Sequence, residues 1–460
     1  MRLDDRDLWP SHEARAAQDA QNVLETGHWG VLHLFDGTPE YQKPPLFYWL
    51  VAGVGWLRGS VVDAWSVRLP AAIAGWLTVA IIVGWLRRRG RPIAACAAGC
   101  AMLCANHFLA TSRTGRIDAP LMCCVTAAIL SSIQSRWVAA SICIAAALML
   151  KGPIGLILFL PVVCATGINP AAHSEKTSPI GKRAAGFIPA VLGVCLAAPW
   201  FIAVSIETHG EFARAFFWHH NFERAAGNSA DLASHPWWFY FARWAVDWLP
   251  ATPALLVAGW VSLKRFWWRD DFELRLGGIW VCTMTALLSL SHFKRADYLL
   301  PAYPGAAILV GCALERLWLT RNDKKWIVTC AAGILGTSLV GAVVFESLIL
   351  PRIDEQFEKR TLADKIRHHR QPEAAVIFFR IEDHLLAYHL GKPLQTIQEW
   401  ENLDIWVSQL ENGCIIMPAE LAAEWPQHIH SGTLREIIRH DEPHRSRSLV
   451  VMESHPAARP

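Results

Sequence analysis

The feature that most constrains the fold is a series of long apolar runs between residues 45 and 350. A membrane-spanning helix needs about 20 mainly apolar residues, and several of these runs reach that length. The chain is 53% hydrophobic and only 18% charged, whereas a soluble globular protein carries about 25% charged residues. The sequence therefore predicts a polytopic membrane protein. It excludes a chain that is soluble throughout, a disordered protein and a disulfide scaffold.

The apolar runs predict about ten spans by length. The expected spans are 66–86, 93–112, 119–135, 137–150, 153–168, 186–206, 237–262, 276–292, 298–316 and 326–349. The run 45–57 is also apolar, but about 13 helical residues rise only about 20 Å, so it predicts a short helix at the membrane interface. Lys151-Gly152-Pro153 breaks the chain between two short spans.

The loops between the spans differ in their content of Lys and Arg. Cytoplasmic loops carry the excess of these residues, and one alternate set of loops, which begins with Arg87, Arg88 and Arg89, holds more than twice as many as the other. The second set is therefore expected on the outer face. Its basic residues are interleaved with acids, aromatics and histidines close to span ends, which favours a functional cavity over ordinary solvated loops.

The chain is expected to have three parts. Residues 1–44 form an extracytoplasmic segment with a juxtamembrane helix, 45–350 form the transmembrane domain, and 351–460 form a small soluble α/β domain, because short apolar runs there alternate with helical stretches. Residues 1–21 contain no apolar region of the kind found in a signal peptide. An outward N-terminal segment without a preceding span leads us to expect that one leading span is missing from this chain.

Five clusters on the expected outer face carry polar and aromatic side chains. They are 11–15, 41–49, 113–120, 216–240 and 294–304. Each has a structural alternative: Glu13 suits the first turn of a helix, Lys43 could simply extend to anionic lipid, and interfacial aromatics usually form belts. Lys43 could equally neutralise the phosphate of a lipid-linked substrate.

The order of the clusters is more specific than any single one. An acidic helix, a KPP loop, an R-x-D turn, a KGP break, an FFW loop with N-x-x-R and a KR-x-DYLLP-x-YP segment follow one another along residues 10–310. In this order they resemble the C-type glycosyltransferases related to lipid A aminoarabinose transferase and protein O-mannosyltransferases. The resemblance implies a helical membrane bundle, a polyprenyl-phosphate sugar donor, an extracytoplasmic active site and inversion at the anomeric carbon.

The resemblance also implies roles for single residues. Lys43 matches the lysine that contacts the donor phosphate, and Asp118 matches an acid of the third motif. The residues implied at the donor phosphate are Lys43, Arg15, Arg224, Lys294, Arg295 and Tyr298. The residues expected to line the sugar and acceptor cavity are Tyr41, Gln42, Arg116, His219, His220, Asn221 and Asp297.

Three positions depart from the family pattern. His12-Glu13 stands where the family usually has Asp-Glu, Gln42 stands where Glu often precedes the KPP loop, and Asn221 falls at a histidine that binds metal in some relatives. The resemblance implies a divalent metal as the one possible cofactor, and the positions that usually supply its ligands are occupied in this chain by Gln42 and Asn221.

The residue types fit sugar transfer independently of the resemblance. A departing phosphate is stabilised by preorganised Lys and Arg in a dry site, and the attacking hydroxyl needs a general base. The candidates for this base are Glu13, Asp118 and His12, in that order.

The sequence thus predicts a multi-pass inner-membrane glycosyltransferase, a hexosyl- or pentosyltransferase of the cell envelope. Its expected partners are a polyprenyl-phosphate sugar, membrane lipids and an outward-facing lipid, glycan or protein acceptor. No nucleic-acid partner is expected, since the net charge is only +3. The alternatives are a catalytically degenerate binder of lipid-linked sugar and a membrane transporter.

Overall fold

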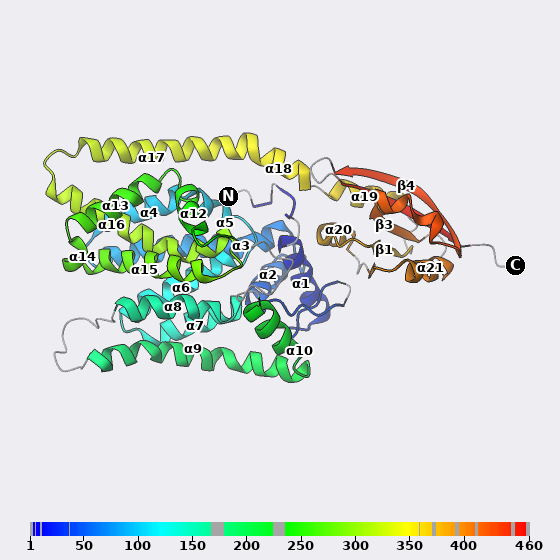
Figure 1. Ribbon diagram of the computed structural model, residues 1–460, viewed down its shortest axis with the longest axis horizontal. Coiled ribbons are helices and arrows are strands. Elements are labelled where there is room, and N and C mark those ends of the chain that lie inside the picture. The colour runs from blue at the N-terminus through cyan, green and yellow to red at the C-terminus, as the bar shows by residue number, and fades with distance from the viewer. Residues whose placement is uncertain are drawn as a thin grey trace.

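The computed structural model describes residues 3–4, 6–9, 12–35, 37–166, 179–223, 235–357, 359–369, 374–391, 395–409, 413–442 and 447–456. Figure 1 shows a bundle of helices joined to a smaller α/β part at the C-terminal end. This architecture confirms the expected fold class, a mainly α transmembrane bundle with a small C-terminal α/β domain.

The helical part includes α1 (His12–Thr26), α2 (Leu46–Leu57), α3 (Ala64–Arg88), α4 (Pro92–Cys104), α5 (Asn106–Ser112), α6 (Asp118–Ile133), α7 (Trp137–Lys151), α8 (Ile154–Thr166), α9 (Pro179–Glu207), α10 (Glu211–Ala213), η1 (Arg214–Glu223), α12 (Phe239–Asp247), α13 (Thr252–Lys264), α14 (Trp267–Asp270), α15 (Phe272–Leu290), η2 (Ala296–Ala302), α16 (Tyr303–Thr320), α17 (Lys325–Val344) and η3 (Phe345–Ile349). The α/β part includes α18 (Leu350–Phe357), α19 (Arg360–His369), β1 (Val376–Phe379), α20 (His384–Leu390), β2 (Gln395–Ile397), α21 (Trp400–Gln409), β3 (Cys414–Pro418), α22 (Ala419–Ala422), η4 (Trp425–Gln427), β4 (Gly432–Glu442) and β5 (Arg447–Pro456).

Several helices are long and apolar enough to cross a membrane. Within the described residues there are five of them, or seven if each of two bent pairs counts as one span. The predicted spans 119–135, 137–150 and 153–168 form α6, α7 and α8, which are apolar but have only 16, 15 and 13 residues. The short helix expected at 45–57 is present as α2, and its position at the membrane interface stays a prediction.

Two predicted spans are bent, which their apolar runs did not indicate. The run 93–112 divides into α4 and α5 with a bend of 73°, and the run 237–262 divides into α12 and α13 with a bend of 116°. Apolar length alone cannot report such a change of direction, because both halves remain equally apolar.

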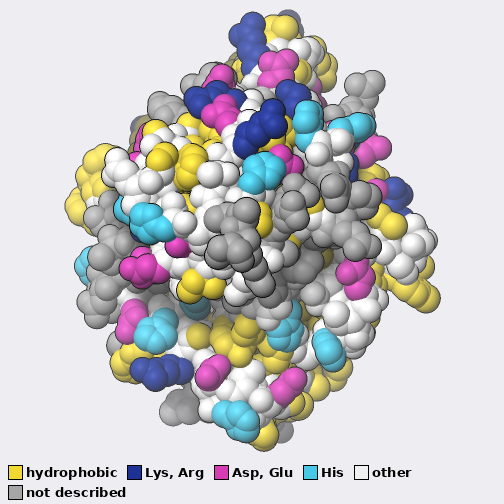
Figure 2. All heavy atoms as spheres, turned by 90° about the vertical axis from the view of Figure 1, so that its right-hand side faces the viewer, with side chains coloured by type: hydrophobic (Ala, Val, Ile, Leu, Met, Phe, Trp, Pro, Cys, Tyr) yellow, Lys and Arg dark blue, Asp and Glu magenta, His cyan; other side chains and the backbone are white. Residues whose placement is uncertain are grey.

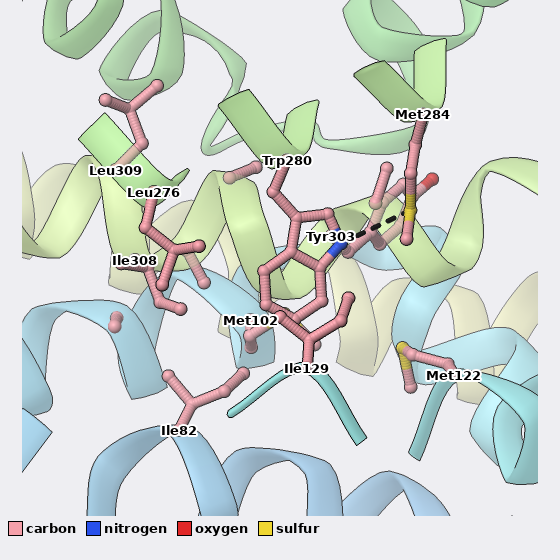
Figure 3. Close-up of a cluster of buried hydrophobic side chains, with 14 of the residues drawn as sticks. Ile82, Met102, Met122, Ile129, Leu276, Trp280, Met284, Tyr303, Ile308 and Leu309 are labelled. Atoms are coloured by element: carbon pink, nitrogen blue, oxygen red, sulfur yellow. Dashed lines mark hydrogen bonds between the residues drawn. The ribbon is translucent and has the colours of Figure 1, made fainter. Parts of the chain in front are cut away.

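The core of the bundle lies between α3, α4, α6, α15 and α16, and Figure 3 shows its centre. Trp280 of α15 is fully buried there, and its indole N–H donates to the Pro301 carbonyl oxygen at 3.0 Å and lies 3.2 Å from the Met284 sulfur. A buried indole is stable when its N–H has a partner. These contacts fix the entry into α16, next to the loops that carry the predicted site.

The C-terminal part is built on a five-stranded sheet of order β2-β1-β3-β5-β4. β1 is parallel to β2 and β3, whereas β5 is antiparallel to β3 and β4. The short apolar runs of this part, at 374–379, 414–417, 434–438 and 448–452, form β1, β3, β4 and β5. The short β2 was missed, because its three residues Gln395–Ile397 include two polar ones.

Helices α1 and α2 lie at the end of the bundle that faces the α/β part (Figure 1). Leu385 of α20 packs into the same buried cluster as residues of α1 and α2. The Gln18 side chain also donates a 2.6 Å hydrogen bond to the His384 carbonyl oxygen. Figure 2 views the molecule from the side of the α/β part and shows Lys, Arg, Asp, Glu and His side chains spread over that face.

Candidate functional site

Helix α1 presents Glu13 to a buried arginine of α3. Arg68 binds both carboxylate oxygens, from Nε at 2.9 Å and from Nη2 at 2.8 Å, and both side chains are 1% exposed. The carboxylate also accepts hydrogen bonds from the Gly115 amide at 2.6 Å and the Trp9 amide at 2.7 Å. Glu13 is therefore a structural anchor that ties α1 to α3 and to the loop before α6.

This arrangement does not support the prediction that Glu13 is the first candidate for the general base. Burial alone would raise the pKa of its carboxyl, but the hydrogen bonds and charge of Arg68 outweigh burial and hold that pKa below its ordinary value. A base must also reach the proton that it removes, and Glu13 lines none of the cavities described below.

His12, the residue before Glu13, points the other way, into the site. Its Nε2 lies 3.2 Å from an Nη1 of Arg295. Since a guanidinium can only donate, Nε2 accepts, and the proton of the neutral ring is on Nδ1. Burial, reinforced by the charges of Lys43, Arg116 and Arg295, lowers the pKa of His12 to about 3. His12 is thus a neutral imidazole that holds Arg295 in place.

Lys43 lies in the loop before α2, where Pro44 and Pro45 set the start of the helix. Its side chain is half-buried, and its ammonium group forms no hydrogen bond or ion pair with any residue that the structure describes. Burial lowers the pKa of Lys43 to about 8, although the nearby Asp118 acts in the opposite direction. A lysine held in this state is suited to bind an anion.

Two carboxylates stand close to Lys43, each already paired. Asp118, at the start of α6, accepts from the Lys151 ammonium at 2.6 Å, and its other oxygen lies 3.6 Å from Arg116 Nε. Asp297 binds Arg116 at 2.8 Å and lies 3.5 Å from Arg295.

The remaining partners of this cluster come from α5 and α7. His107 Nε2 lies 3.2 Å from Asp297. The Lys151 ammonium lies 4.2 Å from the centre of the Tyr298 ring, a cation–π distance. Segments far apart in the sequence thus converge on one alternating group of positive and negative charges.

Three cavities meet at Lys43 and Gln42. The apolar cavity, about 400 Å³, is lined mainly by aliphatic and aromatic side chains of α8, α15 and η2 and by Asp118, Lys151, His220 and Asp297. The central cavity, about 220 Å³, is lined by charged residues including Arg116, Asp118, Lys151 and Arg295 together with Tyr298. The vestibule, about 280 Å³, is lined by His12, Arg15, Glu40, Gln42, Lys43, Tyr48, Glu382 and His384.

The structure brings together most of the predicted site residues. The predicted residues that line at least one of the three cavities are His12, Arg15, Gln42, Lys43, Arg116, Asp118, His220, Arg295, Asp297 and Tyr298. Arg224 lies outside the described residues, and nothing is described of the Asn221 side chain.

Besides Glu13, three of the predicted residues that the structure describes lie outside the three cavities, and Arg15 lines only one of them. The Lys294 ammonium is buried and donates to the carbonyl oxygens of His235 and Ser291, so it does not reach the cavities and the prediction that it binds phosphate is not supported. Tyr41 packs edge-on against Phe212. His219 pairs with Glu223 at 2.8 Å, outside the three cavities. Arg15 lines only the vestibule, away from the central cavity expected to hold the phosphate.

Sequence reasoning missed several members of the site: Arg68, His107, Lys151, Glu40, Glu382 and His384. Lys151 carried a signal, since the KGP break placed a lysine at a span end. Arg68 stands inside a long apolar run, where a single charge changes the overall hydropathy little. Glu382 and His384 come from the other end of the chain, and only the fold shows that they approach α1.

A metal site has no support in the described part of the chain. No group of three or more His, Cys, Asp or Glu side chains there could hold a metal ion. Gln42 stands at one of the two expected metal-ligand positions, and it supplies only an amide where the cavities meet.

Comparison with known proteins adds independent information. Residues 42–204 match the family model for dolichyl-phosphate-mannose-protein mannosyltransferase. The chain is 28% identical to undecaprenyl phosphate-alpha-4-amino-4-deoxy-L-arabinose arabinosyl transferase 1 of Pseudomonas fluorescens over 76% of this chain and 63% of that protein. It is 30% identical to the corresponding transferase of Pseudomonas aeruginosa over 69% of this chain and 58% of that protein. The chain therefore spans less than two thirds of the length of these relatives.

Solved structures agree with the fold. The crystal structure of ArnT from Cupriavidus metallidurans bound to undecaprenyl phosphate superposes with a TM-score of 0.77 at 18% identity and covers 98% of this chain and 95% of its own. The archaeal oligosaccharyltransferase AglB from Archaeoglobus fulgidus gives a TM-score of 0.51 at 12% identity, over 93% of this chain and 69% of that one. At these identities the likeness establishes the shared fold.

Proposed function

We propose that this chain, which belongs to the C-type membrane glycosyltransferase family, moves a sugar from a polyprenyl phosphate to an acceptor on the extracytoplasmic side of the membrane. The matched relatives are named as transferases of 4-amino-4-deoxy-L-arabinose from undecaprenyl phosphate. We propose accordingly that the sugar transferred by this chain is a pentose. The outward orientation is supported by the excess of Lys and Arg in the loops of the opposite face.

The observation that carries the proposal is the position of Lys43 where the apolar and central cavities meet. A polyprenyl phosphate has a long apolar chain and one charged group, so it needs an apolar groove that ends at a cation. The apolar cavity provides side chains such as Ile154, Leu158 and Leu287, and Lys43 stands at its charged end.

The charges of the site suit the departure of a phosphate. Four cations, Lys43, Arg116, Lys151 and Arg295, surround the two carboxylates Asp118 and Asp297. During transfer the bond between the anomeric carbon and the phosphate oxygen breaks, and the phosphodiester leaves as a phosphate monoester with one more negative charge. Preorganised cations stabilise such developing charge strongly in a site that excludes water.

The proton of the attacking hydroxyl needs an acceptor as the new glycosidic bond forms. Glu13 is engaged with Arg68, and His12 accepts from Arg295. Asp118 is ion-paired as well, to Lys151, but unlike Glu13 it lines both the apolar and the central cavities. We assign it as the base, with Lys151 and Arg116 keeping it ionised and in position.

A second function has one observation in its favour. The family's usual acid and glutamate are replaced by His12 and Gln42, both of which line the site. A protein with this change could bind a lipid-linked sugar without transferring it. Release of free polyprenyl phosphate on addition of an acceptor separates the two functions, because only turnover produces it.

The test of the proposed function is the lipid that stays bound during purification. Wild type, Lys43→Ala and Lys365→Ala, whose lysine is exposed on α19, are purified in parallel and their lipids are analysed by mass spectrometry. We expect a polyprenyl-phosphate sugar on wild type and Lys365→Ala and its loss from Lys43→Ala. Bulk phospholipid alone on all three proteins contradicts the proposal.

A further inference from the structure

The vestibule is a polar cavity to which both ends of the chain contribute. Arg15 comes from α1, Glu40 and Lys43 from the loop before α2, and Glu382 and His384 from the start of α20 in the α/β part. Its volume of about 280 Å³ is close to the lower end of the range for small-molecule sites, about 300–1,000 Å³.

The segment that closes the vestibule is held firmly in place. Asp383 caps α20 by accepting from the backbone amides of Leu385 and Leu386. His384 is the inward-facing neighbour: its Nε2 lies 3.0 Å from Arg15 Nη2 and 2.9 Å from a carboxylate oxygen of the more exposed Glu382. The α/β part thus supplies a preorganised wall rather than a loose cover.

The charges that line the vestibule balance. Arg15 pairs with Glu40 at 3.1 Å and lies 3.6 Å from Glu382. Lys43 is the other cation, so two positive and two negative side chains face the space before the donor binds, and the donor phosphate then neutralises Lys43 and leaves no spare positive charge there. The two histidines add no charge at neutral pH. Burial lowers the pKa of both, to about 3 for His12, and the charge of Arg15 lowers that of His384 further.

The vestibule opens onto the site of the proposed reaction. It shares His12, Gln42, Lys43 and Tyr48 with the central cavity. The vestibule and the apolar cavity have only Gln42 and Lys43 in common, so a molecule in the vestibule lies next to Lys43 without filling the apolar cavity.

We propose that the vestibule is the acceptor subsite and that it takes a neutral carbohydrate, with Glu382 and His384 as specificity-determining residues. This inference rests on the proposed function and names the substrate class of the same site. A sugar ring offers several hydroxyls that donate and accept hydrogen bonds, and the vestibule presents both carboxylate acceptors and imidazole and guanidinium donors.

An anionic acceptor fits the vestibule less well. Arg15 is already compensated by Glu40 and Glu382, and Lys43 is the ligand proposed for the donor phosphate. A second anion would meet two carboxylates with no free cation among the described lining residues. Specificity against anionic acceptors therefore follows from repulsion as well as from the absence of a free cation among the described lining residues.

The test measures binding of trehalose and of trehalose 6-phosphate, a matched neutral and anionic pair, to the full chain in nanodiscs by saturation-transfer NMR. Trehalose is expected to bind wild type more tightly than its phosphate. Glu382→Ala is expected to weaken trehalose binding about tenfold, because hydrogen bonds to a charged group are lost. Glu382 is 61% exposed, so this change leaves the fold intact, and His384→Gln is the second variant.

Glu420→Ala, an exposed glutamate on α22, is the control and should bind trehalose like wild type. Tighter binding of the phosphate, no binding of trehalose, or binding that neither vestibule variant changes would overturn the inference. Retention of polyprenyl lipid is measured on the same samples. If wild type keeps that lipid but trehalose fails, only the acceptor inference falls, whereas loss of the lipid from wild type contradicts the proposed function itself.

Discussion

Arg68 shows how a charge can be buried inside a helix that crosses the membrane. All five of its N–H groups have partners: two go to Glu13, and three go to the carbonyl oxygens of Leu3, Arg6 and Asp7. A buried ion pair is tolerated only when its remaining donors and acceptors are satisfied. The backbone carbonyl groups of the segment before α1 therefore stabilise the buried charge of Arg68 in α3.

This pairing gives a first prediction. Glu13→Gln leaves Arg68 without its counter-charge, and breaking one side of a buried pair costs about 3–5 kcal/mol. We expect a clear loss of thermal stability, whereas Glu25→Gln, at an exposed position of the same helix, should melt like wild type. A Glu13→Gln protein that keeps its melting temperature but loses turnover would restore Glu13 as the base.

The pKa of Lys43 gives a second prediction. This pKa is lowered to about 8, so the ammonium is charged at pH 7 and loses its proton as the pH rises through that value. Because a phosphate binds the charged form, affinity for undecaprenyl phosphate should fall with rising pH above about 8, by up to about tenfold per pH unit. Lys43→Arg should remove this decline, since a guanidinium stays charged. Affinity that is flat from pH 7 to 10 in wild type would contradict a phosphate contact by Lys43.

Glycines at the contacts between α4, α15 and α16 allow these helices to pack closely. A Cβ atom added at Gly311 of α16 would come within 2.4 Å of the Ala94 carbonyl oxygen, and one at Gly277 of α15 would come within 2.7 Å of the Gly305 carbonyl oxygen. In lipid, helices associate through small residues that let their backbones approach. These glycines therefore set the distances between the helices that surround Trp280 (Figure 3).

A matched pair of substitutions tests this packing. Gly311→Ala forces α4 and α16 apart and should lower the melting temperature, because overpacking typically costs about 1–3 kcal/mol. Gly336→Ala places the same methyl group on α17, where nothing lies within 4 Å, and alanine favours a helix by up to about 1 kcal/mol over glycine. This variant should be as stable as wild type or more so. Equal stability of both variants would show that the glycine contacts do not limit the packing.

The sequence predicted where helices exist better than how they turn. Apolar length located α3, α15 and α17 within a few residues, because the membrane demands such runs whatever the tertiary fold. The bends at α4–α5 and α12–α13 depend on contacts with other segments, such as the hydrogen bond from the Asn106 amide to the Leu249 carbonyl oxygen. A local pattern contains no information about such partners.

For the molecule as a whole, the candidate site was predictable in part. Motif order identified Lys43, Asp118, Arg295 and Tyr298, and the structure brings these residues to one central cavity. The roles of Glu13 and Lys294 were not predictable, because each depends on side-chain direction and on partners that the motifs do not contain. The same holds for the vestibule, whose wall comes from residues more than 300 positions away from α1.

The meeting of three cavities at Lys43 has a kinetic consequence. Under the proposed function, the donor enters sideways from the bilayer and the acceptor comes from the water phase, so neither blocks the path of the other. Both substrates can then be present in one ternary complex, and no sugar has to be stored on the protein between them. Initial rates plotted at several acceptor concentrations should accordingly give intersecting rather than parallel lines, and the spent lipid can return to the membrane while the product leaves through water.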